Sequence, residues 1–293
     1  MKVLLTGSNG QLSQAFKNIF LKNDIDFIAL NKFELDVSCQ KSLLSSLSSL
    51  KPTILINTAA YTNVDLAETH IDQTFLINEH APSLIAKTCN DLGITFIHFS
   101  TDYVFDGQKK NSYNTNDSTN PINEYGKSKR AGEIEIQKNC SNYLIFRSSW
   151  LFSQYKTNFL KTILNLSSSD KDLSIISDQF GTPTSANDLA EAVFSILPRI
   201  ENDDFSSGIY HYAGEQILSW YEFANEIVTQ AFKMNLIKKT PAIKKITTRE
   251  YDAAAPRPLF SALDSFNTIN EFKMKSSDTY NAIGKVLNAL KKL

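Results

Sequence analysis

Short apolar runs alternate with amphipathic segments along the first 150 residues. The apolar runs predict strands at residues 2–6, 27–30, 53–56, 95–99 and 143–146. Apolar side chains at three- and four-residue spacing predict helices over residues 11–21, 42–50, 65–92 and 125–138, the third with a break near Pro82. Such alternation predicts an α/β fold, in which a doubly wound parallel sheet is covered by helices on both faces.

The pattern changes after residue 150. Runs at 173–176 and 208–212 predict short strands, and segments at 187–197, 220–232 and 278–293 predict helices. We therefore expect a Rossmann-like sheet domain over residues 1–150, to which later segments can return, and a smaller mixed α/β part over residues 151–293. In sheets of this kind, ligands bind at the carboxyl ends of the strands.

Composition excludes several classes of protein. The 293 residues carry 30 Lys and Arg against 31 Asp and Glu, so the chain lacks the basic field of a nucleic-acid-binding protein. No apolar window reaches the length of a membrane span. The three cysteines, Cys39, Cys89 and Cys140, are odd in number and far apart, which favours reduced core thiols in a cytoplasmic protein.

A glycine-containing turn follows the first predicted strand. Gly7 and Gly10 allow a tight turn and a close backbone approach, and the next helix offers free N–H groups to a pyrophosphate. The turn departs from the usual dinucleotide pattern in its spacing and because Ser13 occupies the last glycine position. An ordinary strand–helix turn remains the alternative.

The residues after the second predicted strand bear on the choice of cofactor. This strand ends in Leu30-Asn31-Lys32, without an acid at its tip to hold the ribose hydroxyls. Lys32, beside Asn31, would suit a 2′-phosphate, so we predict NADPH, with NADH left open. A solvated surface lysine is the alternative. Asp36 and Val37 are candidates for the adenine edge.

A tyrosine and a lysine lie four residues apart in a predicted helix. Tyr125 and Lys129 share one face of that helix, so we expect the ammonium to lower the pKa of the phenol, which is ordinarily near 10. The alternative is a solvated helix face. Ser100 and Thr101, directly after the fourth strand, offer hydroxyls to a substrate carbonyl, or else simply cap the strand.

Taken together, these motifs resemble the extended short-chain dehydrogenase/reductases. Within them, the chain is similar to the dTDP-4-dehydrorhamnose reductases over residues 1 to about 265. The matching segments are Gly7-x-x-Gly10-Gln11-Leu12, Ser100-Thr101-Asp102-Tyr103-Val104-Phe105-x-Gly107, Tyr125-Gly126-x-x-Lys129-x-x-Gly132-Glu133, Arg147-x-Ser149-Trp150, Asp178-Gln179-x-Gly181-x-Pro183-Thr184 and Arg257-Pro258.

The resemblance implies NADPH-dependent reduction of the C4 keto group of dTDP-6-deoxy-L-lyxo-4-hexulose to dTDP-L-rhamnose. It makes Tyr125 the proton donor, Lys129 the residue that binds the nicotinamide ribose and tunes Tyr125, and Thr101 the partner of the keto oxygen. The first domain then binds NADP(H) and the second the nucleotide sugar. Cofactor-binding residues expected in all are Gly7, Gly10, Gln11, Leu12, Asn31, Lys32, Asp36, Val37, Ala60, Tyr61, Thr62, Phe99, Tyr125 and Lys129. Expected substrate contacts are Thr101, Asp102, Trp150, whose indole is a platform for a sugar ring, and Arg257, whose guanidinium suits a diphosphate.

Several alternatives stay open. The substrate can be another nucleotide-linked 4-keto-6-deoxy sugar, and a non-catalytic NADP(H)-binding regulator is a second reading. Epimerase activity would need a further acid or base that we do not identify. Asp178 and Gln179 hold either the sugar or a loop. The predicted final helix has no carboxylate after Asp278, so we do not expect a Mg²⁺-bridged dimer but a monomer or a metal-free homodimer.

Overall fold

The molecule is built on a six-stranded parallel sheet. The computed structural model describes residues 1–168 and 172–292. All neighbouring strands of the sheet run parallel, in the order β10-β5-β4-β3-β1-β2. The strands are β1 (Val3–Thr6), β2 (Phe27–Leu30), β3 (Ile54–Asn57), β4 (Thr95–Thr101), β5 (Tyr143–Ser148) and β10 (Gly208–His211). The predicted α/β class with a doubly wound parallel sheet is confirmed.

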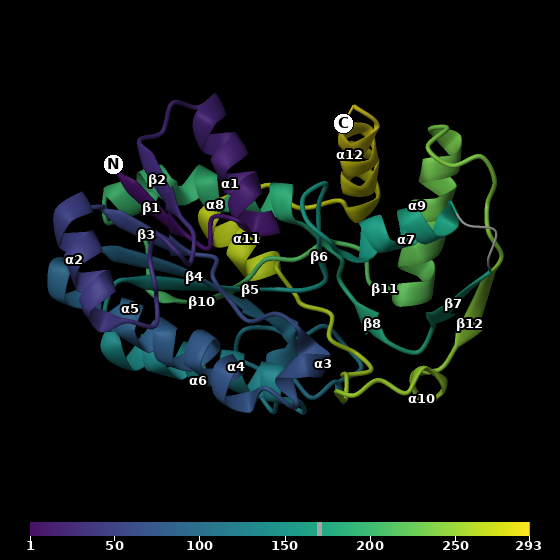
Figure 1. Cartoon of the computed structure of the whole chain (residues 1–293), viewed down its shortest axis with the longest axis horizontal. Helices are drawn as coiled ribbons and strands as arrows, with labels where there is room; N and C mark the ends of the chain where they lie inside the picture. Colours follow the sequence, from purple (N-terminus) through teal and green to yellow (C-terminus); the bar gives the residue numbers. More distant parts are fainter. Residues whose placement is uncertain (169–171, 293) are drawn as a thin grey trace.

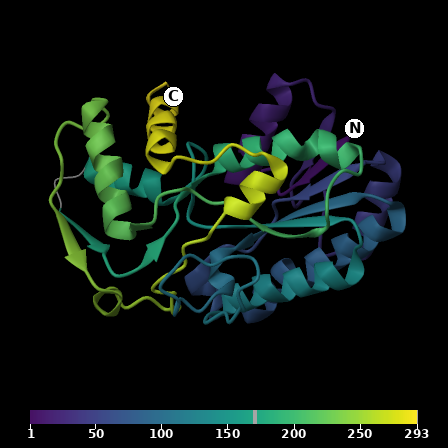
Figure 2. The same ribbon diagram turned by 180° about the vertical axis from the view of Figure 1, so that it is seen from behind.

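Helices cover both faces of this sheet (Figures 1 and 2). One face packs against α1 (Gln11–Lys22), α8 (Ala186–Glu201) and α11 (Phe266–Phe272). The other face packs against α2 (Gln40–Leu50), α5 (Ala81–Leu92) and α6 (Glu124–Asn139). Because both faces are buried, the strands are almost continuously apolar, as in the fully buried β1 and β3.

The chain order of the strands reverses at β1. This strand pairs with β2 on one side and with β3 on the other, and the later strands extend the sheet beyond β3. The loops that leave β1 and β3 therefore diverge at this point of the sheet, where open α/β sheets bind their ligands. The glycine turn is one of these two loops.

A second lobe lies beyond the carboxyl ends of the strands (Figure 1). It contains small two-stranded sheets and its own apolar cluster. Its helices are α7 (Phe159–Ser167), α9 (Trp220–Lys233), α10 (Thr248–Tyr251) and α12 (Thr279–Lys291), and its strands are β6 (Leu151–Phe152), β7 (Leu173–Ile176), β8 (Phe180–Gly181), β9 (Thr184–Ser185), β11 (Leu218–Ser219) and β12 (Ile243–Ile246). Since α8, α11 and β10 belong to the first lobe, the chain crosses between the lobes repeatedly after residue 150.

The structure differs from the expected elements in a few places. The predicted helix over residues 65–92 is divided into α3 (Val64–Ala67), α4 (Ile71–Phe75), a π-helical turn η1 (Leu76–His80) and α5. Its interruption lies before Ile71, whereas the helical backbone continues through Pro82, in the turn of α5 that directly follows the π-helical turn. The predicted end of the last helix at residue 293 lies outside the described residues. No described helix has the length and hydropathy needed to cross a bilayer.

The cysteines are free thiols. Cys89 and Cys140 are buried in the core, as expected. The expectation is wrong for Cys39, which is exposed because it lies at the solvent-facing start of α2.

Candidate active site

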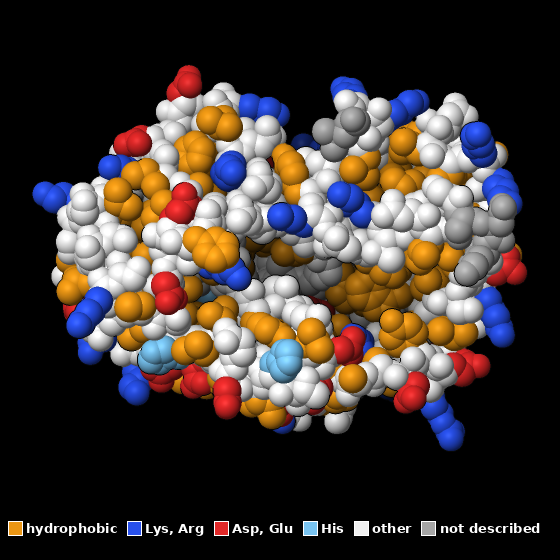
Figure 3. Space-filling model, viewed as in Figure 1, with side chains coloured by type: hydrophobic (Ala, Val, Ile, Leu, Met, Phe, Trp, Pro, Cys, Tyr) orange, Lys and Arg blue, Asp and Glu red, His pale blue; other side chains and the backbone are white. Residues whose placement is uncertain are grey.

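A cavity of about 480 Å³ lies between the two lobes, at the carboxyl ends of β1, β3, β4 and β5. The space-filling view shows this face hollowed between the lobes, with hydrophobic side chains on the side of the second lobe (Figure 3). The predicted residues that line the cavity are Gly10, Gln11, Leu12, Ala60, Thr62, Phe99, Thr101, Asp102, Tyr125, Lys129 and Trp150. The strand-end motifs thus meet in one space.

The turn after β1 has the geometry of an anion-binding loop. Gly7 has φ +69°, and a Cβ there would lie 2.7 Å from the backbone nitrogen of Ala59, so a side chain is excluded on both grounds. Gly10 is the N-cap of α1, and neither a side-chain cap nor an acidic residue occupies the first turn. The amides at this helix end are therefore available to a negatively charged group.

Two buried hydroxyl groups point to a polar ligand in the cavity. Ser100 Oγ and Ser148 Oγ have no hydrogen-bond partner among the described residues, and both residues line the cavity. Buried polar atoms normally have partners, so a ligand with several polar groups fits here. Together with the free helix end, these hydroxyls make the site suitable for a dinucleotide. Sequence reasoning did not identify Ser148, which had no motif of its own.

Tyr125 is positioned by a close approach of α6 to the segment after β4. Asn123 caps α6 by accepting a hydrogen bond from the amide of Gly126 at 2.7 Å. A Cβ on Gly126 would overlap the carbonyl oxygen of Tyr103, so glycine permits this approach. The rings of Tyr103 and Tyr125 meet edge to face, with centroids 5.9 Å apart. The phenol is thereby held beside the Ser-Thr-Asp segment.

The expected lowering of the Tyr125 pKa is wrong for this arrangement. Burial raises the pKa of the phenol to about 12, a hydrogen bond with Thr101 opposes the rise, and the charge of Asp102 adds to it. Lys129 does not bond to Tyr125 but donates to the carbonyl oxygen of Phe99 at 2.6 Å. Burial also lowers the pKa of Lys129, to about 8. Desolvation therefore outweighs the charge interaction that the spacing predicted.

Thr101 and Asp102 form a buried hydrogen-bonded unit with the second lobe. Thr101 Oγ1 donates to Asp102 Oδ1 at 3.0 Å, and Ser261 Oγ donates to Oδ2 at 2.6 Å. Burial raises the pKa of Asp102 to about 7, although both hydrogen bonds oppose this. The carboxyl group therefore exchanges its proton near neutral pH.

The expected adenine-side residues lie outside the main cavity. Contrary to the expectation that no acid stands at the tip of β2, the Glu34 carboxylate folds back and accepts a hydrogen bond from the amide of Asn31 at 2.8 Å. The ammonium group of Lys32 lies over the ring of Phe33, 5.0 Å from its centroid. Asp36 accepts hydrogen bonds from Ser38, Val37 is buried in the core, and the Tyr61 hydroxyl pairs with the ring of His70.

Trp150 is not the open platform that the sequence predicted. Trp220 stacks on one face of its indole, with ring centroids 3.4 Å apart and planes 6° apart. A Cβ on Gly181 would lie 2.6 Å from Cε2 of Trp150, and 2.8 and 2.9 Å from the neighbouring ring atoms Cζ2 and Nε1. These distances place Gly181 over the opposite face. The indole is held between the two residues and presents its remaining edge to the cavity.

Arg257 does not line the main cavity. Its guanidinium donates to Asp65 Oδ2 at 2.8 Å and to the carbonyl oxygen of Ala255. It instead borders a second, more apolar cavity of about 350 Å³, together with Trp220 and Gln179. The carboxylate of Asp65, absent from the sequence analysis, is thus its main partner in this structure.

Further motif residues form hydrogen bonds or ion pairs within the protein. Asp178 accepts from the backbone amide and hydroxyl of Thr248, and Gln179 donates to the same hydroxyl, so both hold the loop. Glu133 and Arg147 form a fully buried bidentate ion pair at 2.8 and 2.7 Å. No group of three or more metal-ligating side chains occurs in the described part of the chain.

Comparisons with known proteins agree with this arrangement. Residues 1–292 match the family described as the RmlD substrate binding domain. The dTDP-4-dehydrorhamnose reductase of Aggregatibacter actinomycetemcomitans is 34% identical, with 97% of this chain and 98% of that protein covered. The corresponding Escherichia coli K12 protein is 33% identical, with 99% and 98% covered.

The chain belongs to the dTDP-4-dehydrorhamnose reductase family.

Solved structures extend this result. The reductase structure from Clostridium acetobutylicum has a TM-score of 0.91 and 31% identity, covering 99% of this chain and all of that one. The reductase from Bacillus anthracis, solved in complex with NADP, has a TM-score of 0.89 and 30% identity, with 98% and 99% covered. Like other members of the dTDP-4-dehydrorhamnose reductase family, the chain is an oxidoreductase that uses a nicotinamide cofactor.

Proposed function

We propose that this reductase uses NADPH to reduce the C4 keto group of dTDP-6-deoxy-L-lyxo-4-hexulose to dTDP-L-rhamnose, with Tyr125 as the proton donor. The observation that carries this proposal is the meeting of Tyr125, Thr101 and Lys129 in one cavity with the glycine turn. The names of the relatives support the substrate, and the NADP complex of the Bacillus anthracis protein supports the cofactor. We expect the reaction to take place in the cytoplasm, in line with the free thiols of all three cysteines.

The residues of the chain perform the acid–base part of the reaction. When bound, the reduced nicotinamide supplies the hydride that adds to C4. Because its pKa is raised, Tyr125 holds its proton at neutral pH and can transfer it to the carbonyl oxygen, which becomes the C4 hydroxyl. Thr101 lies beside Tyr125 and donates its one hydroxyl hydrogen to Asp102 in this structure, and it would orient the substrate oxygen by turning that hydrogen toward it. After the reaction, the Tyr125 phenolate regains its proton from solvent or from Lys129.

We assign cofactor binding to the first lobe. The amides around Gly10, Gln11 and Leu12 would hold the pyrophosphate, with Gly7 shaping the turn. Ala60, Tyr61, Thr62 and Phe99 would flank the nicotinamide ribose, Asn31 and Lys32 the 2′-phosphate, and Asp36 and Val37 the adenine.

We assign substrate binding to the region between the lobes. Asp102 and the edge of Trp150 would contact the sugar in the main cavity. Arg257, at the border of the second cavity, would reach the diphosphate through a guanidinium donor that is not committed to Asp65.

The direct test is a coupled assay. A 4,6-dehydratase and a 3,5-epimerase would supply the 4-keto sugar while NADPH oxidation is followed. We expect Tyr125→Phe to lower kcat by about 10²- to 10⁴-fold with nearly unchanged NADPH affinity. Tyr280→Phe, at an exposed tyrosine on α12, is the matched control and should retain full activity. Turnover of Tyr125→Phe at the wild-type rate would exclude this phenol as the donor.

The same assay separates the remaining readings. Activity only with another nucleotide-linked 4-keto-6-deoxy sugar would change the substrate, and tight NADPH binding without turnover of any such sugar would favour a regulatory protein. The binding of NADPH and of NADH is then measured for the wild-type chain and for Lys32→Ala. We expect NADPH binding to weaken more than NADH binding, because only NADPH carries the 2′-phosphate. Equal weakening would contradict this role of Lys32.

A further inference from the structure

A continuous row of buried polar side chains lies behind Lys129. Thr6 Oγ1 donates to Asn57 Oδ1 at 2.6 Å, Asn57 Nδ2 lies 3.1 Å from His98 Nδ1, and His98 Nε2 lies 3.1 Å from Lys129 Nζ. The four residues come from β1, β3, β4 and α6, and each is at most 2% exposed. The reaction described above uses only the lysine.

The orientation of the Asn57 amide is set by a backbone donor. The N–H of Ala59 donates to Asn57 Oδ1 at 3.1 Å, and the Thr6 hydroxyl donates to the same oxygen. A backbone N–H can only donate, so the oxygen must face Ala59 and the NH₂ group must face His98. His98 Nδ1 is therefore a hydrogen-bond acceptor.

This assignment fixes the proton of the imidazole. Burial, and then the charge of Lys129, holds the pKa of His98 well below its ordinary value, so the ring is neutral and carries one N–H. With Nδ1 accepting, that hydrogen is on Nε2 and points at Lys129 Nζ. An ammonium group has only donors and would oppose the N–H, whereas a neutral amine has a lone pair that accepts it.

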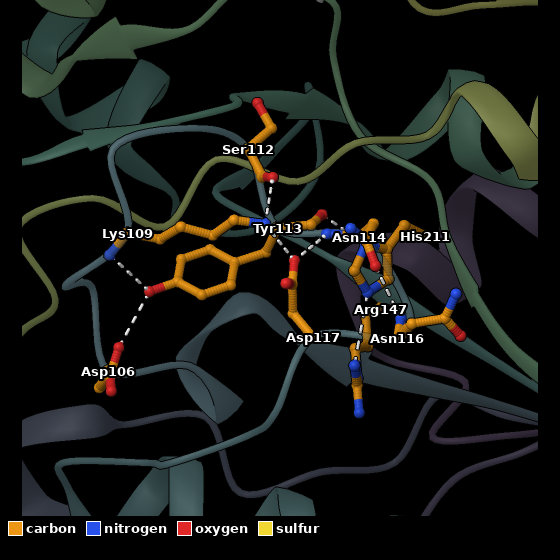
Figure 4. Close-up of polar contacts among 9 residues, drawn as sticks. All are labelled: Asp106, Lys109, Ser112, Tyr113, Asn114, Asn116, Asp117, Arg147 and His211. Atoms are coloured by element: carbon orange, nitrogen blue, oxygen red, sulfur yellow. Dashed lines mark hydrogen bonds and ion pairs between the residues drawn. The ribbon is translucent and has the colours of Figure 1, made fainter.

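His211 shows how a buried histidine is satisfied without such a conflict. Its Nδ1 lies 3.0 Å from the carbonyl oxygen of Tyr113 and must carry the hydrogen, while its Nε2 lies 3.4 Å from Arg147 and accepts. Figure 4 includes His211 with both partners. The His211 ring thus faces an acceptor at Nδ1 and a donor at Nε2. The His98 ring faces the amide donor of Asn57 at Nδ1 and, whenever Lys129 is charged, an ammonium donor at Nε2 as well.

We propose that His98 is a positioning residue that favours the neutral amine of Lys129 by directing its Nε2–H at the lysine nitrogen. Glu133, on α6, is the charged group that acts on Lys129 besides its own burial, and Tyr125 on α6 and Asp102 after β4 line the same cavity. The Glu133 carboxylate favours the ammonium form but is already bound by Arg147. The balance allows Lys129 to take up and release a proton near neutral pH. The consequence for turnover rests on the proposed function, because it matters only if Lys129 returns a proton to Tyr125.

The test follows the titration of Lys129 itself, without substrate. The full chain would be labelled with ¹³C at the lysine ε carbons, and the Lys129 signal would be assigned by its loss in Lys129→Met. We expect the wild-type signal to titrate near pH 8. In His98→Gln, the amide oxygen can face the ammonium, so we expect the titration to move up by about one pH unit or more.

Two further variants make the outcome decisive. His98→Asn, whose shorter amide retains a partner for Asn57 and withdraws from Lys129, should move the titration in the same direction if His98→Gln does not fold. His211→Gln, a matched change at the other buried histidine, should leave it in place. A wild-type Lys129 that titrates like an ordinary lysine, or His98 variants that shift it no more than His211→Gln, would overturn the proposal. The expected titration shifts with an unchanged pH profile of turnover would instead leave the role of His98 standing and count against the proposed return of a proton from Lys129 to Tyr125.

Discussion

Gly181 tests whether the orientation of Trp150 matters for catalysis. In Gly181→Ala the new Cβ would lie 2.6 Å from Cε2 of the indole. Ordinary van der Waals contact begins at about 3.4 Å, so the ring and the β8 backbone must separate by about 0.8 Å. The indole cannot retreat along its normal, because Trp220 is stacked 3.4 Å behind it. The whole tryptophan pair, or β8 itself, must move.

The size of this displacement sets the expected effect. A misplacement of about 1 Å in a substrate-positioning group can lower the rate by about 10²-fold. We therefore expect kcat/KM for the nucleotide sugar to fall by about 30- to 100-fold, with NADPH affinity unchanged since Gly181 lies in the second lobe. Overpacking should also reduce the free energy of unfolding by about 1–3 kcal/mol.

The assay combines steady-state kinetics with tryptophan fluorescence. The chain has two tryptophans, and both are in this stack, so the emission reports directly on its geometry. Gly284→Ala is the matched control, because its Cβ would meet only the flexible ends of Gln230, at 3.0 Å, and Met234, at 3.6 Å. It should retain normal kinetics and emission. A Gly181→Ala protein with altered fluorescence but kcat/KM within twofold of wild type would show that Trp150 does not position the substrate.

Two further predictions concern buried charges. Glu133→Gln leaves the fully buried Arg147 guanidinium without its counter-charge, and we expect urea unfolding to show a loss of about 3 kcal/mol, whereas a loss below about 1 kcal/mol would contradict a stabilising pair. Asp102→Asn removes a carboxyl group whose pKa in the folded chain, about 7, exceeds its unfolded value of about 4. The folded state holds a proton that the unfolded state loses across this window, so the group's contribution to stability falls as pH rises from about 4 to 7. Urea unfolding of Asp102→Asn should therefore depend less steeply on pH there, and parallel curves for the two proteins would refute this.

The sheet was predictable from the sequence because its pattern is strong. Strands buried on both faces are continuous apolar runs, and all five predicted strands of the first 150 residues occur within two residues of their expected ends. The doubly wound topology then brings the loops after β1, β3 and β4 together at one edge. The predicted strand-end motifs therefore line one cavity, although the sequence indicated no contact between them.

Long-range partners were not predictable in the same way. The partner of Arg257 is Asp65, 192 positions away, and the partner of Trp150 is Trp220, at the start of α9. Neither pair has a sequence spacing that signals it. The strands β6, β8, β9 and β11 have two residues each, too few to repeat the two-residue period of a strand, and were missed for that reason.

The tyrosine–lysine pair shows where spacing alone misleads. Positions four apart on a helix place Tyr125 and Lys129 on one face, but desolvation is the largest cause of the pKa shift of each group. Lys129 is directed at β4, where its nitrogen lies 2.6 Å from the carbonyl oxygen of Phe99 and 3.1 Å from His98 Nε2. The protonation state of Lys129 therefore depends on His98, a residue of β4 and not of the helix that carries the pair. That dependence follows from one backbone amide, at Ala59, which orients Asn57 and through it the imidazole that faces the lysine.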